Sequence, residues 1–426
     1  MKFFSMLLAL ASLAGCASGR QVAKYSDHWE ELGRNAPPPE AGHRLIGVVE
    51  VPASSPRATH TAQITSGYRT APAMNQTGWP AATSPEWRRA NGNIGVHTAS
   101  KASPAVDASG VYVGGDSSQF HAYEHDGRER WRFSVAGASR GIHATAALDE
   151  EFLYFGAYNG NLYKLRKGDG APSWILNLGH AIGASPLLSG RFLYVGVELA
   201  QPANGFLVKI DRATGQEFWR TELLGEQLHS SPVLDPVQGH LLFGANNGQL
   251  FSVDEKTGRI RWRFSANGPI KGSPLVLGDS VFFTSWDGNV YALNTRDGSL
   301  RWQTNVGRSQ SSPARIPGSE ILLLGIEGAV IGLKEGTGEL AWKRLAPGYK
   351  AISSGAPVIL GKQGAAWIGC ETRGICLFSS SGEVLARLKL EGTLTGIPVP
   401  WNNTLYFSED APGSLVRWNL NEPVPR

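Results

Sequence analysis

The chain has 426 residues, of which 52 are glycine and 18% are charged, and its formal net charge is +4. So small a positive charge, with no basic block interleaved with aromatic residues, argues against a nucleic-acid-binding protein. Abundant glycine and low charge favour a turn-rich all-β protein over a helical one.

The chain begins with a pattern typical of bacterial export signals. Lys2 precedes an apolar run, residues 3–13, that is too short to span a bilayer and ends in Leu-Ala-Gly-Cys at Cys16. This pattern resembles a lipoprotein signal, so we predict that residues 1–15 are removed and that Cys16 carries the lipid. Ala17 after the cysteine, in place of aspartate, resembles lipoproteins sent to the outer membrane. The alternative is an ordinary signal peptide with an incidental cysteine.

Residues 16–82 show no sustained hydrophobic period and are rich in proline, alanine, serine and threonine. We interpret them as a largely disordered tether, apart from one helical turn expected at residues 28–32. A random coil of this length would span roughly 45 Å.

Beyond the tether, tryptophan recurs at steps of 40 to 45 residues, at Trp87, Trp131, Trp174, Trp219, Trp262, Trp302 and Trp342. All but the first stand four residues after a glycine: Gly127, Gly170, Gly215, Gly258, Gly298 and Gly338. A period near 40 residues with its own turn signal indicates one supersecondary unit repeated many times.

Each unit contains signals for four strands. The first strand is expected to open with a small-small-Pro motif, such as Ala184-Ser185-Pro186. Turns such as Asn159-Gly160 join the second and third strands, and the fourth strand holds the tryptophan. Four antiparallel strands per unit predict the blade of a β-propeller. Arginines beside the tryptophans, such as Arg132 and Arg263, are interpreted as solvated charge that keeps outer edges from pairing.

The units predict an all-β, eight-bladed β-propeller of four-stranded antiparallel blades over residues 83–426. Opening strands are expected near residues 102, 144, 184, 230, 272, 311, 355 and 396. The seventh unit has Ala386 in place of tryptophan, and the eighth has only three strands before the chain ends. A strand at residues 84–91, around Trp87, is therefore predicted to complete the last blade and close the ring.

Cys370 and Cys376 are six residues apart. A three-residue hairpin loop ending at Gly374, with this glycine in the left-handed conformation, would place the two cysteines opposite each other. In an oxidising compartment we expect a disulfide. Two buried free thiols are the alternative, and the spacing does not indicate a metal site.

The segment from Leu293 to Trp302 and its copies resemble the tryptophan-docking repeat of quinoprotein-type (PQQ-like repeat) propellers, over residues 84–420. With eight blades and a lipoprotein signal, the chain is most similar to the propeller lipoprotein family of the outer-membrane β-barrel assembly (Bam) complex. This resemblance implies a non-catalytic scaffold on the periplasmic face of the outer membrane. Its implied partner is the barrel-inserting subunit.

The same superfamily contains PQQ-dependent oxidoreductases, which are the alternative. If this chain resembled the alcohol-oxidising members, we would expect it to be longer. We would also expect adjacent cysteines and a calcium site of Glu, Asn and Asp. This chain has no adjacent cysteines. Gly355 and Gly361-Lys362 do not form a phosphate loop, and no Gly-x-Ser-x-Gly elbow is present. We therefore predict no catalytic residue, no metal and no cofactor.

Two candidate binding sites remain. Residues at one equivalent position before the opening strands should ring one mouth of the central channel: Lys101, His143, His229, Lys271 and Gln310. A positive, hydrogen-bonding ring favours a small anionic ligand or an acidic partner segment, and a water-filled mouth is the alternative. The second candidate is an exposed partner loop, or a tolerated insertion, that lengthens the third blade's hairpin: Glu198, Leu199, Gln201 and Pro202.

Overall fold

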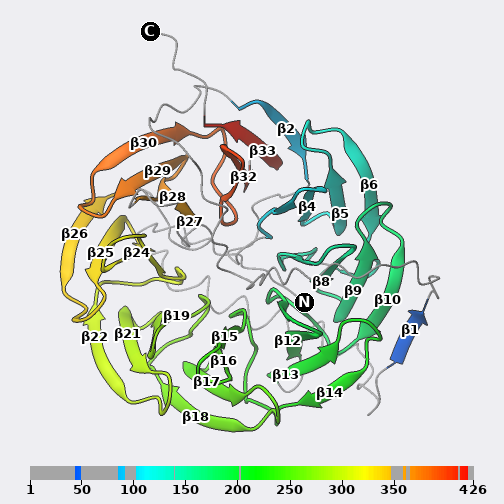
Figure 1. Ribbon diagram of the computed structural model, residues 1–426, viewed down its shortest axis with the longest axis horizontal. Coiled ribbons are helices and arrows are strands. Elements are labelled where there is room, and N and C mark those ends of the chain that lie inside the picture. The colour runs from blue at the N-terminus through cyan, green and yellow to red at the C-terminus, as the bar shows by residue number, and fades with distance from the viewer. Residues whose placement is uncertain are drawn as a thin grey trace, which may run out of the picture.

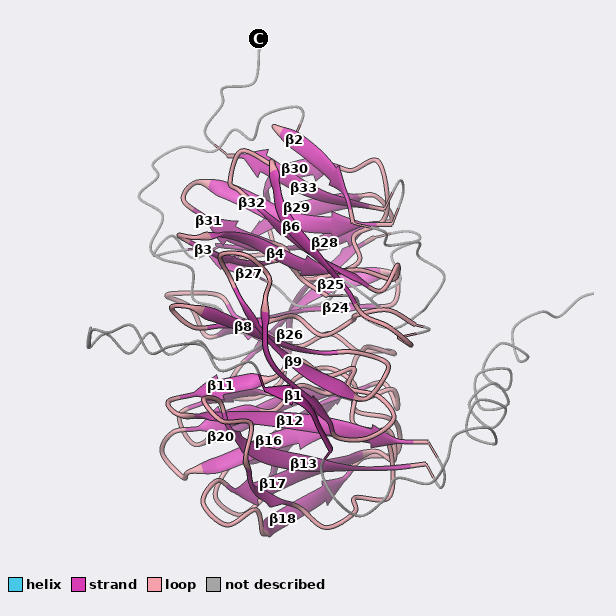
Figure 2. Cartoon of the chain, turned by 90° about the vertical axis from the view of Figure 1, so that its right-hand side faces the viewer, coloured by secondary structure: helices cyan, strands magenta, loops and turns pink. Residues whose placement is uncertain are grey.

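Eight antiparallel sheets radiate from one axis in the computed structural model of the protein (Figure 1). The structure describes residues 44–48, 85–91, 102–138, 140–200, 203–346, 358–360, 365–410 and 413–420. Regular structure in these ranges is entirely β, and Figure 2 shows the ring edge on. A helix of the length and apolarity needed to cross a membrane is not found in these ranges. The eight-bladed propeller predicted from the repeat is confirmed.

Seven blades are built from four strands that are consecutive in sequence. In each of them the first strand lies nearest the axis and the fourth lies at the rim. Blade 1 is β3 (Ala105–Asp107), β4 (Gly110–Gly114), β5 (Gln119–Tyr123) and β6 (Glu129–Ser134). Blade 2 is β7 (Ala147–Leu148), β8 (Phe152–Gly156), β9 (Asn161–Arg166) and β10 (Pro172–Asn177). Blade 3 is β11 (Leu187–Ser189), β12 (Phe192–Leu199), β13 (Asn204–Asp211) and β14 (Glu217–Arg220). Blade 4 is β15 (Val233–Asp235), β16 (His240–Gly244), β17 (Gln249–Asp254) and β18 (Ile260–Ser265).

The remaining blades follow the same plan until the last. Blade 5 is β19 (Leu275–Leu277), β20 (Ser280–Thr284), β21 (Asn289–Asn294) and β22 (Leu300–Asn305). Blade 6 is β23 (Ala314–Arg315), β24 (Ile321–Ile326), β25 (Ala329–Lys334) and β26 (Leu340–Leu345). Blade 7 is β27 (Val358–Leu360), β28 (Ala365–Glu371), β29 (Gly374–Ser379) and β30 (Val384–Lys389). Blade 8 is β31 (Val399–Trp401), β32 (Thr404–Glu409), β33 (Ser414–Asn419) and, from the other end of the chain, β2 (Trp87–Ala90).

The pairing of β2 with β33 closes the ring, as the sequence predicted (Figure 1). Trp87 pairs with Arg417 in the antiparallel register. Arg88 forms ion pairs with Glu391, at 3.4 Å, and with the fully buried Glu409 of β32. Because Glu409 has no access to water, the Arg88 charge stabilises it, and loss of the β2 strand would leave a buried carboxylate uncompensated.

The small-small-Pro motifs precede the innermost strands and do not form them, which corrects the predicted strand starts. Proline has no N–H to donate to a sheet ladder. Instead, hydroxyls of four of these motifs, and of the equivalent Thr145 in blade 2, each accept a hydrogen bond from a backbone N–H of a neighbouring blade. These bonds are Ser103 N to Thr145 Oγ1 (2.9 Å), Thr145 N to Ser185 Oγ (2.9 Å), Ser185 N to Ser231 Oγ (2.9 Å), Ser273 N to Ser312 Oγ (2.8 Å) and Ile397 N to Ser103 Oγ (2.8 Å).

The tryptophans lock neighbouring blades at the rim. Each indole Nε1 donates to a backbone carbonyl of the next blade, for example Trp262 to Thr295 at 2.9 Å. The same bond is made by Trp87, Trp131, Trp174, Trp219, Trp302 and Trp342. Gly298 lies under the Trp262 ring at φ +73°, and a Cβ there would be 2.6 Å from Trp262 Cε3. In six of these seven turns the glycine therefore belongs to the binding site of the preceding blade's tryptophan, whereas Gly215 faces Leu176.

This contact explains why blade 7 has Ala386 in place of tryptophan. A glycine that receives an indole stands in the turn between the third and fourth strands of the following blade, as Gly382 does for Trp342. In blade 8 the third and fourth strands, β33 and β2, come from opposite ends of the chain. No such turn joins them, so a tryptophan in blade 7 would have no equivalent receiving glycine.

One part of the predicted tether has a defined backbone. β1 (Arg44–Val48) pairs antiparallel with β10 and adds a fifth strand to the rim of blade 2 (Figure 1). This strand was not predicted, because it is too short to show a hydrophobic period. Five residues are enough to pair along the edge of an existing sheet. The predicted signal peptide, Cys16 and the predicted helical turn at residues 28–32 lie outside the described residues.

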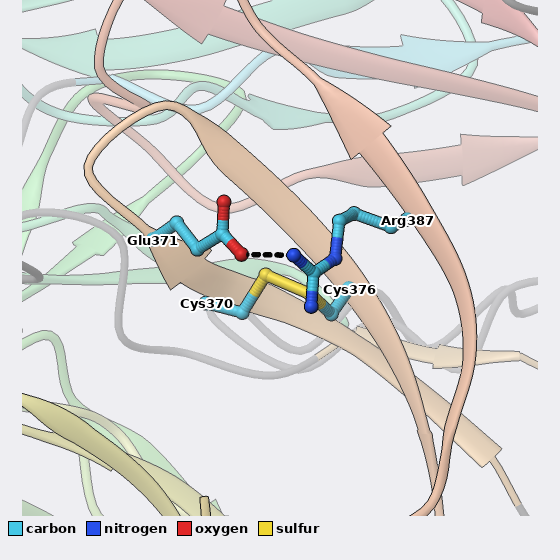
Figure 3. The surroundings of a disulfide bond; sticks show 4 residues. All are labelled: Cys370, Glu371, Cys376 and Arg387. Atoms are coloured by element: carbon cyan, nitrogen blue, oxygen red, sulfur yellow. Dashed lines mark hydrogen bonds and ion pairs between the residues drawn. A yellow bond between two sulfur atoms is a disulfide. The ribbon is translucent and has the colours of Figure 1, made fainter. Parts of the chain in front are cut away.

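Cys370 and Cys376 form a disulfide within the hairpin of β28 and β29, with Cα atoms 5.6 Å apart (Figure 3). Both cysteines are buried between blades 6 and 7. Beside them Glu371 and Arg387 form an ion pair that joins this hairpin to β30 (Figure 3). The structure thus contains the bridge expected from the spacing of the two cysteines.

The turn of this hairpin differs from the prediction. Glu371 pairs directly with Gly374, so the turn contains only Thr372 and Arg373, and a register shift places Cys370 in a bulge. Gly374 is the first residue of β29 and does not adopt the left-handed conformation. The extra residue of the hairpin is accommodated by the bulge in the strand, and no glycine in the turn is required.

Candidate functional site: the channel mouth

One face of the ring is formed by the turns between second and third strands and by the connections between blades. His143, His229, Lys271 and Gln310 lie in those connections, as the repeat predicted, whereas Lys101 lies outside the described residues. The channel-mouth cluster is defined here as these four residues with Glu198, Trp286 and Arg308. Its members come from blades 2 to 6 and their connections.

Two cations share one aromatic ring in this cluster. Lys271 Nζ lies 4.1 Å from the centroid of the Trp286 ring, and the Arg308 guanidinium carbon lies 3.9 Å from it. Trp286 occupies the turn after β20. A ring quadrupole attracts each cation by about 0.5–2 kcal/mol, which helps to hold two like charges close together. Trp286 and Arg308 are not predicted by the repeat, because neither occupies the position that repeats.

Glu198 supplies the negative charge of the cluster. It is the penultimate residue of β12, with only 1% of its surface exposed, and its Oε1 lies 3.2 Å from His229 Nδ1. Neither carboxylate oxygen accepts a hydrogen bond from the described part of the chain. A buried carboxylate without such donors is costly, and the nearby Lys271 charge compensates for it.

The prediction that Glu198 and Leu199 form an exposed partner loop is therefore wrong. β12 and β13 are eight residues long and stay paired through Leu199 and Asn204, so the extra length extends the hairpin as strand. Leu199 is half-buried and packs against the core between blades 2 and 3. Gln201 and Pro202, at the tip, lie outside the described residues.

The other two predicted ring residues are placed differently. His143 is buried, with Nε2 3.0 Å from Asp116 Oδ1 and its ring edge-on to Tyr158 at 4.7 Å. Gln310 Nε2 is buried and donates no hydrogen bond to the described residues. The mouth is therefore not a uniform positive ring. Its cations lie at Lys271 and Arg308, whereas His143 is paired with the Asp116 carboxylate.

This arrangement suits carboxylate recognition better than metal binding. Lys271 and Arg308 are donors with fixed positions above an aromatic ring, and Gln310 adds an unused amide N–H. Within the described ranges, no group of three or more His, Cys, Asp or Glu side chains is placed to hold a metal ion.

Burial lowers the pKa of Lys271 to about 8, since desolvation penalises its charged form. The Arg308 charge lowers this pKa further, and the Glu198 charge partly opposes the shift. An unfolded lysine retains its proton up to about pH 10.4. Between these two values the unfolded chain binds more protons than the folded chain, so this group makes stability rise with pH.

Replacing Lys271 by methionine is therefore expected to remove part of the increase in stability between pH 8 and pH 10. The variant also loses the charge that compensates the buried Glu198, so the slope of stability with pH, and not the absolute stability, is the test. Urea unfolding midpoints across this pH range measure the effect. Lys334→Met, at the exposed end of β25 in blade 6, is the control. Equal pH slopes for parent and Lys271→Met would contradict the assignment.

Comparison with known proteins places these features in a family context. A family model described as outer membrane protein assembly factor BamB matches residues 70–198 and 203–422, and omits the tip of the blade 3 hairpin. The BamB of Yersinia pestis is 28% identical over 179 residues, which cover 38% of this chain and 43% of that protein. The alignment thus spans less than half the length of this relative.

Solved structures share the fold at low sequence identity. The crystal structure of BamB from Moraxella catarrhalis matches with a TM-score of 0.60 and 19% identity, over 74% of this chain and 95% of that chain. A europium-containing methanol dehydrogenase matches with a TM-score of 0.62 and 14% identity, over 76% and 84% of the two chains. At these identities the two matches establish the architecture and not the activity.

Proposed function

Since this chain belongs to the family of outer membrane protein assembly factor BamB, we propose that it is a non-catalytic scaffold that binds partner proteins in outer-membrane β-barrel assembly. The observation that carries the proposal is the family match, which spans nearly the whole propeller. The structure supplies a suitable platform. Hydroxyl–backbone bonds near the axis and indole–carbonyl bonds at the rim connect neighbouring blades, so the loops are held in fixed positions.

We place the protein at the periplasmic face of the outer membrane, attached through Cys16, with residues 1–15 as the signal, 16–82 as the tether and 83–426 as the propeller. The support is the lipoprotein-like sequence before Cys16. Labelling of cells with a radioactive fatty acid should mark the parent protein and not a Cys16→Ser variant. Equal labelling of both would contradict the anchor.

The channel-mouth cluster is the proposed partner contact. Lys271 and Arg308 present two positive charges at one point of this face, so an acidic segment of the barrel-inserting subunit would be attracted there. The alternative is a small anionic ligand that binds to Lys271 and Arg308.

Affinity purification after crosslinking in cells tests this function. The parent protein should retain the barrel-inserting subunit, and the double variant Lys271→Glu/Arg308→Glu should lose most of it. Arg259→Glu/Arg296→Glu makes the same change of charge at exposed turns on the opposite face and should retain the subunit. Failure of the parent to retain any assembly subunit would contradict the scaffold function. Equal retention by both variants would contradict only the contact.

A PQQ-dependent oxidoreductase is the second candidate, because quinone enzymes share the fold. The residues of this chain do not fit it: its only disulfide among the described residues joins cysteines six positions apart, and no adjacent cysteines occur. Reduction of a dye by the purified protein with added quinone and calcium would overturn the scaffold proposal.

A further inference from the structure

The outer strand of blade 2 differs from the outer strands of the other blades. β10 has the sequence Pro-Ser-Trp-Ile-Leu-Asn and carries no charge, whereas the other seven described outer strands all contain arginine or lysine. The contrast is sharpest directly after the tryptophan position. There the eight blades have, in order, Arg132, Ile175, Arg220, Arg263, Gln303, Lys343, Arg387 and Arg88.

Charges at this position protect the exposed edges of the sheets. The side chains of Arg132, Arg263 and Arg387 are 58%, 53% and 55% exposed. A charged, solvated side chain on an outer strand opposes the approach of another strand, because pairing would desolvate it. Ile175 imposes no such cost, and it packs partly against the core between blades 1 and 2. The edge of β10 is therefore the one that is open to strand addition.

A fifth strand occupies this same edge. β1 pairs antiparallel with β10, matching Arg44 with Asn177, Leu45 with Leu176 and Val48 with Trp174 (Figure 1). The pairing is short, and a register shift interrupts it between Leu45 and Gly47. β1 has no second neighbouring strand among the described residues. It is thus a marginal strand, and the edge that it occupies is the only uncharged one among the described outer strands.

We propose that the β10 edge binds extended segments of unfolded client chains by strand addition, and that β1 occupies it until a client displaces it. Backbone pairing with β10 would supply affinity, and alternating side chains would supply selectivity. The class of client rests on the function proposed above, because strands of outer-membrane barrels alternate apolar and polar residues over about ten positions. β1 competes from the same chain, at an effective concentration on the order of millimolar.

The experiment uses the full-length protein and a labelled peptide of about ten residues, alternating valine and threonine between terminal lysines. Fluorescence anisotropy measures binding, and a peptide with two central prolines is the control. Leu45→Pro/Val48→Pro, which releases β1, should bind about tenfold more tightly than the parent. Arg44→Cys/Asn177→Cys, oxidised to fix β1 on β10, should not bind, whereas the single variant Arg44→Cys should resemble the parent.

Ile175→Arg tests the edge itself. Added to Leu45→Pro/Val48→Pro, it should weaken peptide binding about tenfold. It should leave the melting temperature nearly unchanged, because blades 1, 3 and 4 have arginine at the same position. Should it unfold the protein, Ser173→Arg, which mimics Arg130 of blade 1, provides the same test.

Undiminished peptide binding by the oxidised cysteine pair would overturn the proposal. So would a released variant that forms dimers in the ultracentrifuge and binds no peptide, since the occupant would then be a second copy. Peptide binding requires no assembly subunit, and Ile175→Arg should leave co-purification of the barrel-inserting subunit intact. Failure of this proposal is therefore separable from failure of the scaffold function.

Discussion

The Trp87→Ala variant is expected to lose about 3–5 kcal/mol of unfolding free energy, the range for truncating a large buried aromatic side chain. Trp87 is 8% exposed, its ring centroid lies 6.0 Å from that of Tyr406 in blade 8, and its Nε1 donates to the His125 carbonyl of blade 1 at 3.0 Å. Truncation removes this packing and leaves a carbonyl without its donor.

The loss should also change how the protein opens, because Trp87 belongs to the strand that closes the ring. β2 is held in blade 8 by pairing with β33 and by contacts of Arg88 with Glu409. If β2 detaches, the β33 edge becomes exposed and Glu409 loses its ion pair with Arg88, whereas every other outer strand remains joined by a turn to its own blade. The Trp87→Ala protein should therefore be cleaved by protease near residues 85–91 under conditions that leave the parent intact.

Two control variants separate packing from closure. Trp302→Ala removes an equivalent docked indole from blade 5 and should lower the denaturation midpoint without making residues 85–91 sensitive to protease. Leu345→Ala, at a side chain that is 78% exposed, should do neither. A Trp87→Ala protein as stable as Leu345→Ala would show that β2 does not close the ring.

The sequence predicted the architecture well because its signals are local and repeated. The glycine and the tryptophan of one unit stand four residues apart, and this spacing revealed the blade number and the place of Trp87. The spacing did not reveal their contacts, since every repeated tryptophan except Trp174 docks on the glycine of the next blade, about 40 residues away. The absence of a tryptophan at Ala386 could be explained only from the structure. Blade 8 lacks the turn that would receive this tryptophan, because its fourth strand comes from the other end of the chain.

The candidate site was less predictable, for two physical reasons. Residues at the repeated position converge on the channel mouth by symmetry, so His143, His229, Lys271 and Gln310 were found. Their partners Trp286 and Arg308 belong to other positions, and no period marks them. Glu198 was read as a loop residue, because its sequence could not show that β12 continues to Leu199 and buries the carboxylate.

Gly298→Ala should be strongly destabilising for the addition of a single methyl group. Gly298 has φ +73°, where a side chain costs about 1–2 kcal/mol, and its new Cβ would lie 2.6 Å from Cε3 and 2.8 Å from Cδ2 of Trp262. The indole cannot move away freely, since its Nε1 is bonded to the Thr295 carbonyl at 2.9 Å. Forcing it aside should add about 1–3 kcal/mol of overpacking cost.

Gly278→Ala is the matched control for this substitution. Gly278 also has a positive φ, +58°, but a Cβ there would meet nothing within 4 Å. The two variants thus share the backbone cost and differ in the contact with an indole. Chemical denaturation should show Gly298→Ala to be less stable than Gly278→Ala by about 1–3 kcal/mol, together with a change in tryptophan emission that Gly278→Ala lacks. Equal losses of stability in the two variants would contradict this prediction. They would mean that glycine is required at residue 298 only for its backbone conformation, and not for its contact with the indole of the preceding blade.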